Sequence, residues 1–300
     1  MTESRSHLKG YLFTLIGAIM FSTKAIIVKL SFRETQVDPI SLLALRMVFS
    51  LPFFLITGYV ASKNKEVKPL STKQWYSIIG LGLLGYYLSS LLDFIGLKYI
   101  TAGLERLILF LYPTFTVLIN HYVFKEPFTR RQLSALSLCY AGICFTFYNE
   151  MWQAKEMQHM LLGSGLIFLC SVTYASYLVG TGRLLKQINV LRYTSLAMLS
   201  ATAGVLIHYV VQGQYGLSDL KGHMVMYGIL LAIVATVIPN FLISRGIQLI
   251  GSNHSAILSA IGPVSTILLA YFFLGENLDF FQIIGTGLVI GGVIILGWKK

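Results

Sequence analysis

Five ionisable residues lie inside long apolar segments of this 300-residue chain, where charge is rare and costly. They are Lys24, Arg46, Asp93, Glu105 and Arg106. At the centre of a bilayer, a charged side chain costs at least about 2.5–3.5 kcal/mol, so such residues are functional candidates. At a helical rise of 1.5 Å per residue, the first four lie within about 10 Å of one end of their segments. The sequence therefore predicts a polar layer near one end of a helical bundle.

The mixed signs of this layer suit a zwitterion such as an amino acid. The planar guanidinium of Arg46 would bind a carboxylate with two hydrogen bonds, and Lys24 would add a second positive contact. Asp93 or Glu105 would receive an ammonium group, and Asp93 is also the stronger candidate to carry a coupling proton. The alternative is structural: Lys24 and Arg106 extend to the interface on their long stems, and Arg46 and Asp93 only hold two helices together.

Polar residues at helical spacing extend the candidate substrate site beyond the charges. Small and hydroxyl residues also let helices pack closely in lipid, which is the competing interpretation for each. Tyrosines are the stronger candidates because they both stack and form hydrogen bonds. The additional candidates are Tyr112, Thr116, Tyr174, Tyr177, Asn240 and Ser259.

Two prolines, Pro113 and Pro263, lie within apolar segments. Each removes one helical hydrogen bond and predicts a bend. Such bends are expected where a transporter gates, although they would also serve helix packing alone.

Motifs for enzyme chemistry are missing from the sequence. The six histidines show no helical metal spacing, and the three cysteines all lie in apolar runs. We find no G-x-S-x-G, H-E-x-x-H or phosphate-loop motif. The sequence thus predicts no catalytic residues, cofactor or metal site.

The composition excludes a soluble globular enzyme and a disordered chain. Hydrophobic residues make up 55% and charged residues 12%, against about 45–50% and 25% in soluble domains. The net charge of +11 would suggest nucleic acid as a partner in a soluble protein. Here the charges separate apolar runs, so the lipid bilayer is the expected partner and nucleic acid is not.

Ten segments are long and apolar enough to cross a bilayer, which takes about 20 residues. If the N-terminus is cytoplasmic, the inner segments hold 15 Lys and Arg residues and the outer ends only 6. This bias predicts cytoplasmic termini. We therefore expect an all-α, multi-pass protein of the cell inner membrane. The segments are 9–30, 39–60, 75–97, 102–124, 132–148, 161–181, 190–211, 225–247, 255–274 and 280–298.

The chain also contains an internal repeat. At an offset of 150, residues 96–142 align without gaps to 246–292, and in both copies a proline precedes a glutamate by 13 residues. Each half holds five segments, and because five is odd the second half enters the membrane inverted. We expect one repeat at 1–148, an extracytoplasmic loop at 149–160, and a second repeat at 161–300. The G-x-x-x-G spacing of Gly287 and Gly291 permits a homodimer, but packing within a monomer is the preferred interpretation.

Two stretches carry a family resemblance: GLERLILFLYPTFTVLINHYVFKEPFTRRQ and NHSAILSAIGPVSTILLAYFFLGENLDFFQ. Each resembles the fourth-to-fifth helix region of an EamA-type member of the drug/metabolite transporter superfamily. The resemblance implies a ten-helix inner-membrane carrier that moves amino acids or other small metabolites, often outward. One departure is Lys125–Glu126, where the family usually has Gly-Glu, as at Gly275–Glu276. We interpret both glutamates as turn or capping residues.

The leading functional prediction is a secondary transporter for a small polar metabolite, such as a zwitterionic amino acid or a derivative. It would work by alternating access, with the substrate near the midplane, and the family resemblance implies export. The alternatives are a carrier of nucleosides, nucleotide-linked metabolites or lipophilic drugs, and a membrane receptor that does not transport.

Overall fold

The computed structural model describes residues 2–63, 69–125, 130, 133–134, 137–138, 140–142, 144–145, 157–212, 222–259, 261–276 and 280–297. Within these ranges the chain is helical and contains no strand. The first half contributes α1 (Thr2–Thr35), α2 (Pro39–Lys63), α3 (Thr72–Gly82), η1 (Leu83–Leu88), α4 (Ser89–Gly96), α5 (Ala102–Leu109) and α6 (Tyr112–Phe124). The second half contributes α8 (Met157–Leu184), α9 (Val190–Gln212), α10 (Gly222–Ala232), η3 (Ile233–Val237), α11 (Ile238–Leu258), α12 (Ile261–Leu274) and α13 (Phe280–Gly297).

Seven helical segments in the described ranges are long and apolar enough to cross a membrane, and two shorter apolar helices follow. Apolar side chains point outward as well as inward, as at Ile56 and Val60 of α2, which are 63% and 62% exposed. A helix that is hydrophobic on all sides is typical of a membrane span. The prediction of a multi-pass membrane protein is therefore confirmed. Within the predicted span 132–148, residues 132, 135–136, 139, 143 and 146–148 lie outside the described residues.

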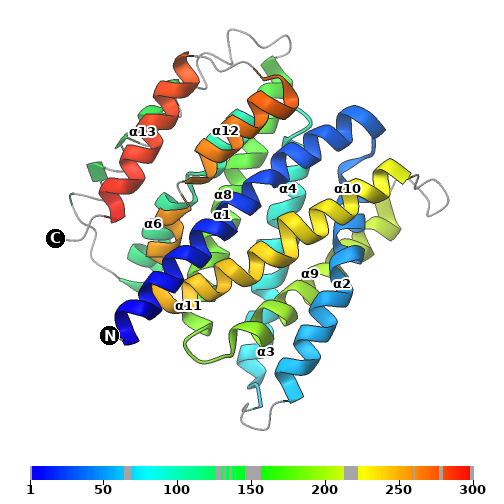
Figure 1. Cartoon of the computed structure of the whole chain (residues 1–300), viewed down its shortest axis with the longest axis vertical. Helices are drawn as coiled ribbons and strands as arrows, with labels where there is room; N and C mark the ends of the chain where they lie inside the picture. Colours follow the sequence, from blue (N-terminus) through cyan, green and yellow to red (C-terminus); the bar gives the residue numbers. More distant parts are fainter. Residues whose placement is uncertain are drawn as a thin grey trace.

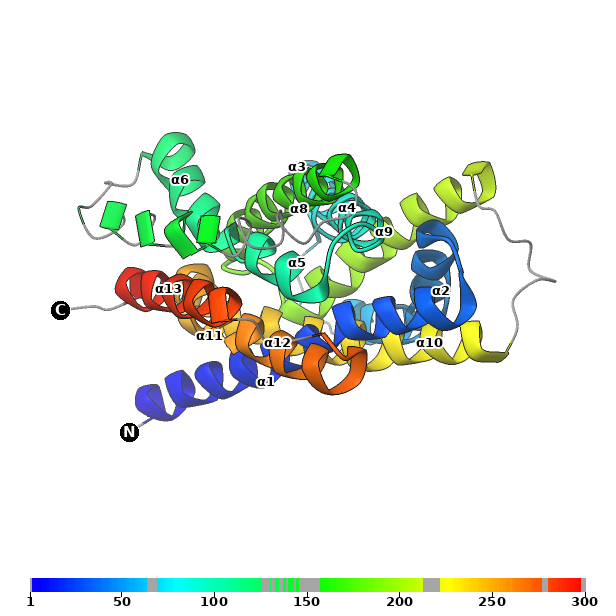
Figure 2. The same ribbon diagram turned by 90° about the horizontal axis from the view of Figure 1, so that it is seen from above.

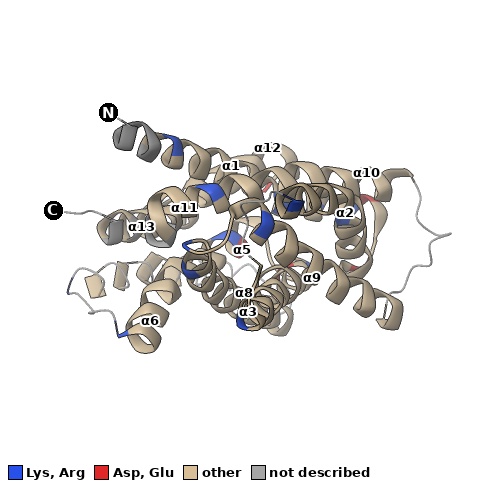
Figure 3. Cartoon of the chain, turned by 90° about the horizontal axis from the view of Figure 1, so that it is seen from below, with Lys and Arg blue, Asp and Glu red and all other residues tan. Residues whose placement is uncertain are grey.

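The helices of the two halves interlock. Helix α1 packs along α10, α11 and α12, while α8 packs against α3, α4, α5 and α6. Figures 1 and 2 show this arrangement, with α1 beginning and α13 ending on the same side of the bundle. Charges are sparse along the ribbons, as Figure 3 shows. Because α1 and α8 each pack against helices of the other half, the core forms where the two halves meet.

Local irregularities recur at the interval of the sequence repeat. The π-helices η1 and η3 begin at Leu83 and Ile233, which are 150 residues apart. A second break separates α5 from α6 and α11 from α12. Pro113 and Pro263 lie in the first turn after each break, where a missing N–H costs little. The two prolines thus lie directly after short breaks between helices.

The turn that ends span four and its counterpart after α12 both use left-handed backbone. Lys125 has φ 56° and Gly275 has φ 68°. Glycine adopts this conformation freely, whereas a side chain costs about 1–2 kcal/mol. The departure from Gly-Glu seen in the sequence therefore leaves the turn geometry unchanged and places a strained residue in it.

The observed helices extend beyond the predicted spans at several ends. Helix α1 covers Thr2–Thr35 and α8 covers Met157–Leu184, against 9–30 and 161–181 predicted. Hydropathy marks the part of a helix that lies in hydrocarbon, and backbone hydrogen bonding carries the helix onward into the polar interface.

Candidate functional site

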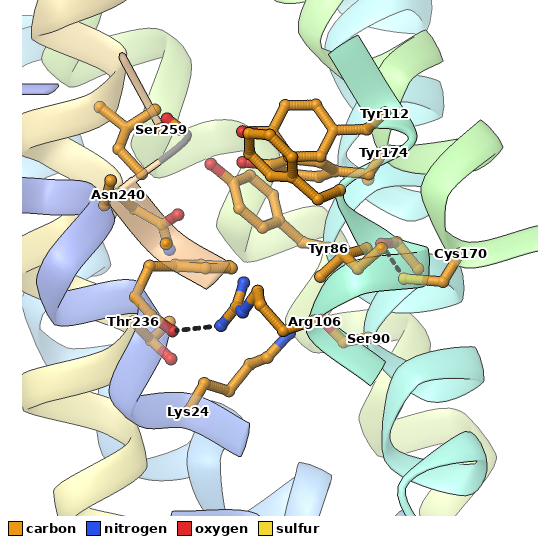
Figure 4. A pocket seen from close by; sticks show the side chains of 18 of the residues that line it. Lys24, Tyr86, Ser90, Arg106, Tyr112, Cys170, Tyr174, Thr236, Asn240 and Ser259 are labelled. Carbon is orange, nitrogen blue, oxygen red and sulfur yellow. Dashed lines mark hydrogen bonds between the residues drawn. The ribbon is translucent and has the colours of Figure 1, made fainter. Parts of the chain in front are cut away.

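A buried polar pocket lies between the two halves (Figure 4). Side chains from α1, α2, η1, α4, α5 and α6 of the first half line it, together with side chains from α8, η3, α11 and α12 of the second half. Its interior volume is about 40 Å³, which is enough for a few water molecules. A metabolite can enter only after the surrounding helices move apart.

Six of the ten predicted substrate residues line this pocket. They are Lys24, Arg46, Tyr112, Tyr174, Asn240 and Ser259. The other four lie outside the lining. Asp93 and Glu105 are fully buried, Thr116 donates a hydrogen bond to the Tyr112 carbonyl at 2.7 Å, and the Tyr177 hydroxyl bonds that of Tyr86 at 2.6 Å.

Lys24 and Asp93 form a buried ion pair. Lys24 Nζ lies 2.8 Å from Asp93 Oδ2, and the two side chains are 4% and 0% exposed. The ammonium also lies 5.0 Å from the centre of the Phe21 ring. The interpretation that Arg46 pairs with Asp93 is not what the structure shows, since Lys24 occupies that place.

Arg106 joins α5 to both helices that face it. Its Nε donates to Thr266 Oγ1 of α12 at 2.9 Å, and its terminal nitrogen donates to the Phe21 carbonyl of α1 at 3.3 Å. Glu105 Oε2 lies 4.0 Å from the same Nε. Arg106 is 5% exposed, so it does not extend to the interface but cross-links the two halves.

Arg46 differs from the other two cations. Its guanidinium donates to Ser90 Oγ at 2.9 Å and lies 5.2 Å from the centre of the Phe94 ring. Its Nε is buried without a hydrogen-bond partner. No described carboxylate lies within 4.0 Å of it. A buried, under-satisfied guanidinium at a pocket wall is suited to a carboxylate.

Aromatic rings form the opposite wall. Tyr112 and Tyr174 meet edge to face at 5.1 Å, and Tyr174 stacks on Phe21 at 6.3 Å. Figure 4 shows Tyr86, Tyr112 and Tyr174 gathered together, with Lys24 reaching in from the other side. The pocket thus combines positive groups with flat apolar surfaces.

The π-helices place several of the lining residues. Tyr86 and Gly85 come from η1, and Thr236 comes from η3. A Cβ on Gly85 would lie 2.2 Å from Tyr177 Cγ, so this glycine lets the Tyr177 ring approach. π-Turns are frequent at functional sites, but they leave no signature in the sequence. Cys170, whose Sγ is hydrogen-bonded to Ser89 Oγ at 3.2 Å, lines the pocket but was not among the predicted site residues.

At the far end of α1, the turn after α12 caps α5. The Glu276 carboxylate accepts hydrogen bonds from the Ala102 and Gly103 backbone N–H groups at 3.0 and 3.3 Å. A carboxylate at a helix N-terminus is favourable because it meets free N–H groups and the positive end of the dipole. The interpretation of Glu276 as a cap thus fits, although the helix it caps belongs to the other half. Glu126 lies outside the described residues.

A cleft of about 390 Å³ opens beside this cap. Its charged residues are Lys29, Arg33, Lys98 and Glu276. It lies about one and a half turns of α1 beyond Lys24.

Comparison with known proteins places this geometry in a family. The model of the EamA-like transporter family matches residues 8–148 and 161–298. An uncharacterized transporter of Bacillus subtilis, YcbK, is 30% identical, with 100% of this chain and 96% of the relative covered. An uncharacterized transporter of Synechocystis, sll1319, is 24% identical over 99% and 95% of the two chains. A solved crystal structure superposes with a TM-score of 0.70 at 18% identity, covering 98% and 97% of the two chains.

The chain therefore belongs to the EamA-like transporter family. It is a multi-pass membrane transporter and not an enzyme.

Proposed function

We propose that this protein is a secondary transporter that carries a small carboxylate-bearing metabolite through the buried pocket. An amino-acid derivative that keeps its carboxylate has the functional group that the lining residues would recognise. The observation that carries the proposal is Arg46, a buried guanidinium at the pocket wall with an unpartnered Nε. A substrate carboxylate would satisfy both its charge and its free donor.

Alternating access of two inverted repeats is the mechanism that we propose. The repeated π-helices and helix breaks support it, as does a family model that matches the chain in two stretches. The small pocket volume also supports it, because a metabolite would need one side of the bundle to open. In such transporters the halves rock about a central site.

We place the protein in the cell inner membrane with both termini cytoplasmic, on the distribution of Lys and Arg. Export is the direction that we propose, following the resemblance of the sequence to EamA-type carriers. Asn240, Ser259 and Tyr112 would provide hydrogen bonds to the substrate from the second half and from α6.

Counterflow in proteoliposomes tests this function. Vesicles loaded with an unlabelled metabolite mixture should accumulate the labelled form of any transported compound, and export from cells with and without the protein narrows the panel. Arg46→Ala and Asp93→Asn should each reduce exchange at least about tenfold, since each removes one charge-assisted contact or its support. Lys73→Gln, at an exposed cation of α3, should exchange normally. Unchanged exchange in both pocket variants, with normal insertion, would contradict the proposal.

A further inference from the structure

We infer that the substrate is a net anion, a monocarboxylate with a flat or apolar body and no free ammonium group, and that zwitterionic amino acids are poor substrates. This inference rests on the proposed transport function and decides the substrate class of that same pocket.

The first argument is the position of the charges. Lys24, Arg46 and Arg106 all line the pocket. Among the residues that the structure describes, no Asp or Glu lines it; Asp93 and Glu105 are 0% exposed and do not belong to the lining. A substrate in the pocket therefore meets positive charge and hydroxyl groups.

The second argument is the balance of charge. Lys24 is paired with Asp93 at 2.8 Å, and Arg106 is the cation nearest to Glu105 at 4.0 Å. Arg46 is the third cation, with no described carboxylate within that range. With both carboxylates ionised, the cluster carries one excess positive charge in a buried site, where an uncompensated ion is strongly unfavourable. One negative charge on the substrate would neutralise this excess, whereas a zwitterion adds no net charge.

The third argument concerns the ammonium group of an amino acid. Its best partners would be Asp93 and Glu105, but the Lys24 ammonium already pairs with Asp93, and neither carboxylate belongs to the pocket lining. An ammonium in the pocket would therefore have to compete with Lys24 and Arg106 for these carboxylates. The remaining partners on the lining are neutral groups such as Asn240 and Tyr86, which compensate a buried ammonium less well than a carboxylate does.

The aromatic wall defines the body of the substrate. Phe21, Tyr112 and Tyr174 form a continuous set of ring contacts on the pocket. Flat or branched apolar groups pack well against such faces, and an aromatic ring adds about 0.5–1.5 kcal/mol beyond its buried area.

The cleft at the far end of α1 has the same preference. Three cations line it, and its one carboxylate, Glu276, is held by the α5 backbone. Arg33 and Lys98 are exposed there. A cleft in which positive charge predominates raises the local concentration of anions, so this cleft would attract them. The cleft and the pocket are separate features, and both favour negative charge.

The test uses matched compounds that share a body and differ in charge. We would compare phenylalanine, N-acetylphenylalanine, phenylpyruvate and phenethylamine, and the corresponding leucine series, by counterflow at pH 7.5 with protein-free vesicles subtracted. The inference expects the anions to exchange at least about tenfold faster than the zwitterion of the same body. Equal or faster exchange of the zwitterions would overturn the inference and leave the proposed transport function standing. If a wider metabolite panel of both charge classes showed no exchange, the transport function itself would fail.

Arg46 variants give a test that does not depend on absolute activity. Arg46→Gln removes the excess charge, so the ratio of anion to zwitterion exchange should fall at least about tenfold, even if both rates drop. Arg46→Lys keeps the charge and should largely keep the ratio. Lys73→Gln should leave it unchanged. A proportional loss of both classes in Arg46→Gln would show that Arg46 only supports the fold, which would contradict the inference.

Discussion

At the residue scale, the site consists of buried charges whose partners decide what each can do. The sequence places Lys24, Arg46 and Asp93 inside apolar spans, and the free-energy cost of burying a charge in the bilayer is enough to make them functional candidates. Which cation takes the carboxylate could not be predicted, because that depends on side-chain direction and on which helices become neighbours. In the structure, Lys24 forms an ion pair with Asp93, and Arg46 donates a hydrogen bond to Ser90. The sequence predicts a zwitterion site, whereas the cluster in the structure holds three cations and two carboxylates, and Arg46 is the cation that no described carboxylate approaches within 4.0 Å.

Lys24→Met is expected to destabilise the protein strongly. It leaves Asp93 buried without its partner, and breaking a buried pair from one side costs about 3–5 kcal/mol. The midpoint of thermal unfolding in detergent should fall. The double variant Lys24→Met with Asp93→Leu removes both charges and should recover most of the loss. If the single variant were as stable as the parent protein, the ion pair would not contribute as its geometry implies.

At the element scale, the position of the site depends on helix irregularities that repeat 150 residues apart. The sequence predicts the spans, the prolines and the repeat from hydropathy and residue type. It does not reveal that Leu83–Leu88 and Ile233–Val237 are π-helices, since these arise from tertiary packing and carry no local motif. Helical spacing thus marks Tyr86 and Thr236 as polar residues that could line a path, but it does not reveal the π-helices that carry them.

Gly85→Ala is expected to impair transport by displacing Tyr177. The added Cβ would lie 2.2 Å from Tyr177 Cγ, so the ring must shift and the bond between the Tyr86 and Tyr177 hydroxyls is lost. Overpacking of this kind typically costs about 1–3 kcal/mol.

Gly80→Ala is the matched control one turn earlier in the same span, where an added Cβ meets nothing within 4 Å. It should stabilise the helix by up to about 1 kcal/mol. Thermal unfolding and counterflow rates would check both variants. Equal behaviour of the two would contradict the close approach at Gly85.

Lys125→Gly is expected to stabilise the protein by about 1 kcal/mol. Lys125 has the left-handed backbone that Gly275 adopts without strain. The reciprocal Gly275→Ala should destabilise by a similar amount. Denaturation of the purified protein in detergent would measure both changes. A loss of stability in Lys125→Gly would mean that the lysine side chain contributes more than its backbone strain costs.

At the scale of the whole molecule, two interlocked halves enclose a pocket that is too small for a metabolite at about 40 Å³. The membrane class and the family can be predicted from the sequence alone, because the length of the apolar segments and the repeated proline–glutamate spacing are visible in it. The interlocking of α1 with α10–α12 and of α8 with α3–α6 could not be predicted, since many helix arrangements satisfy the same hydropathy. The proposed mechanism of alternating access requires the pocket to open to each side in turn.

The native thiol of Cys170 allows a direct measurement of that opening. Cys170 lines the pocket and is 1% exposed. In a background with Cys139 and Cys144 replaced by Ser, a small membrane-impermeant thiosulfonate would be applied to right-side-out and inside-out vesicles. The account predicts modification of Cys170 from both sides, slowed by a transported substrate. Modification from one side alone, or from neither, with exposed reporter cysteines labelling normally, would contradict alternating access through this pocket.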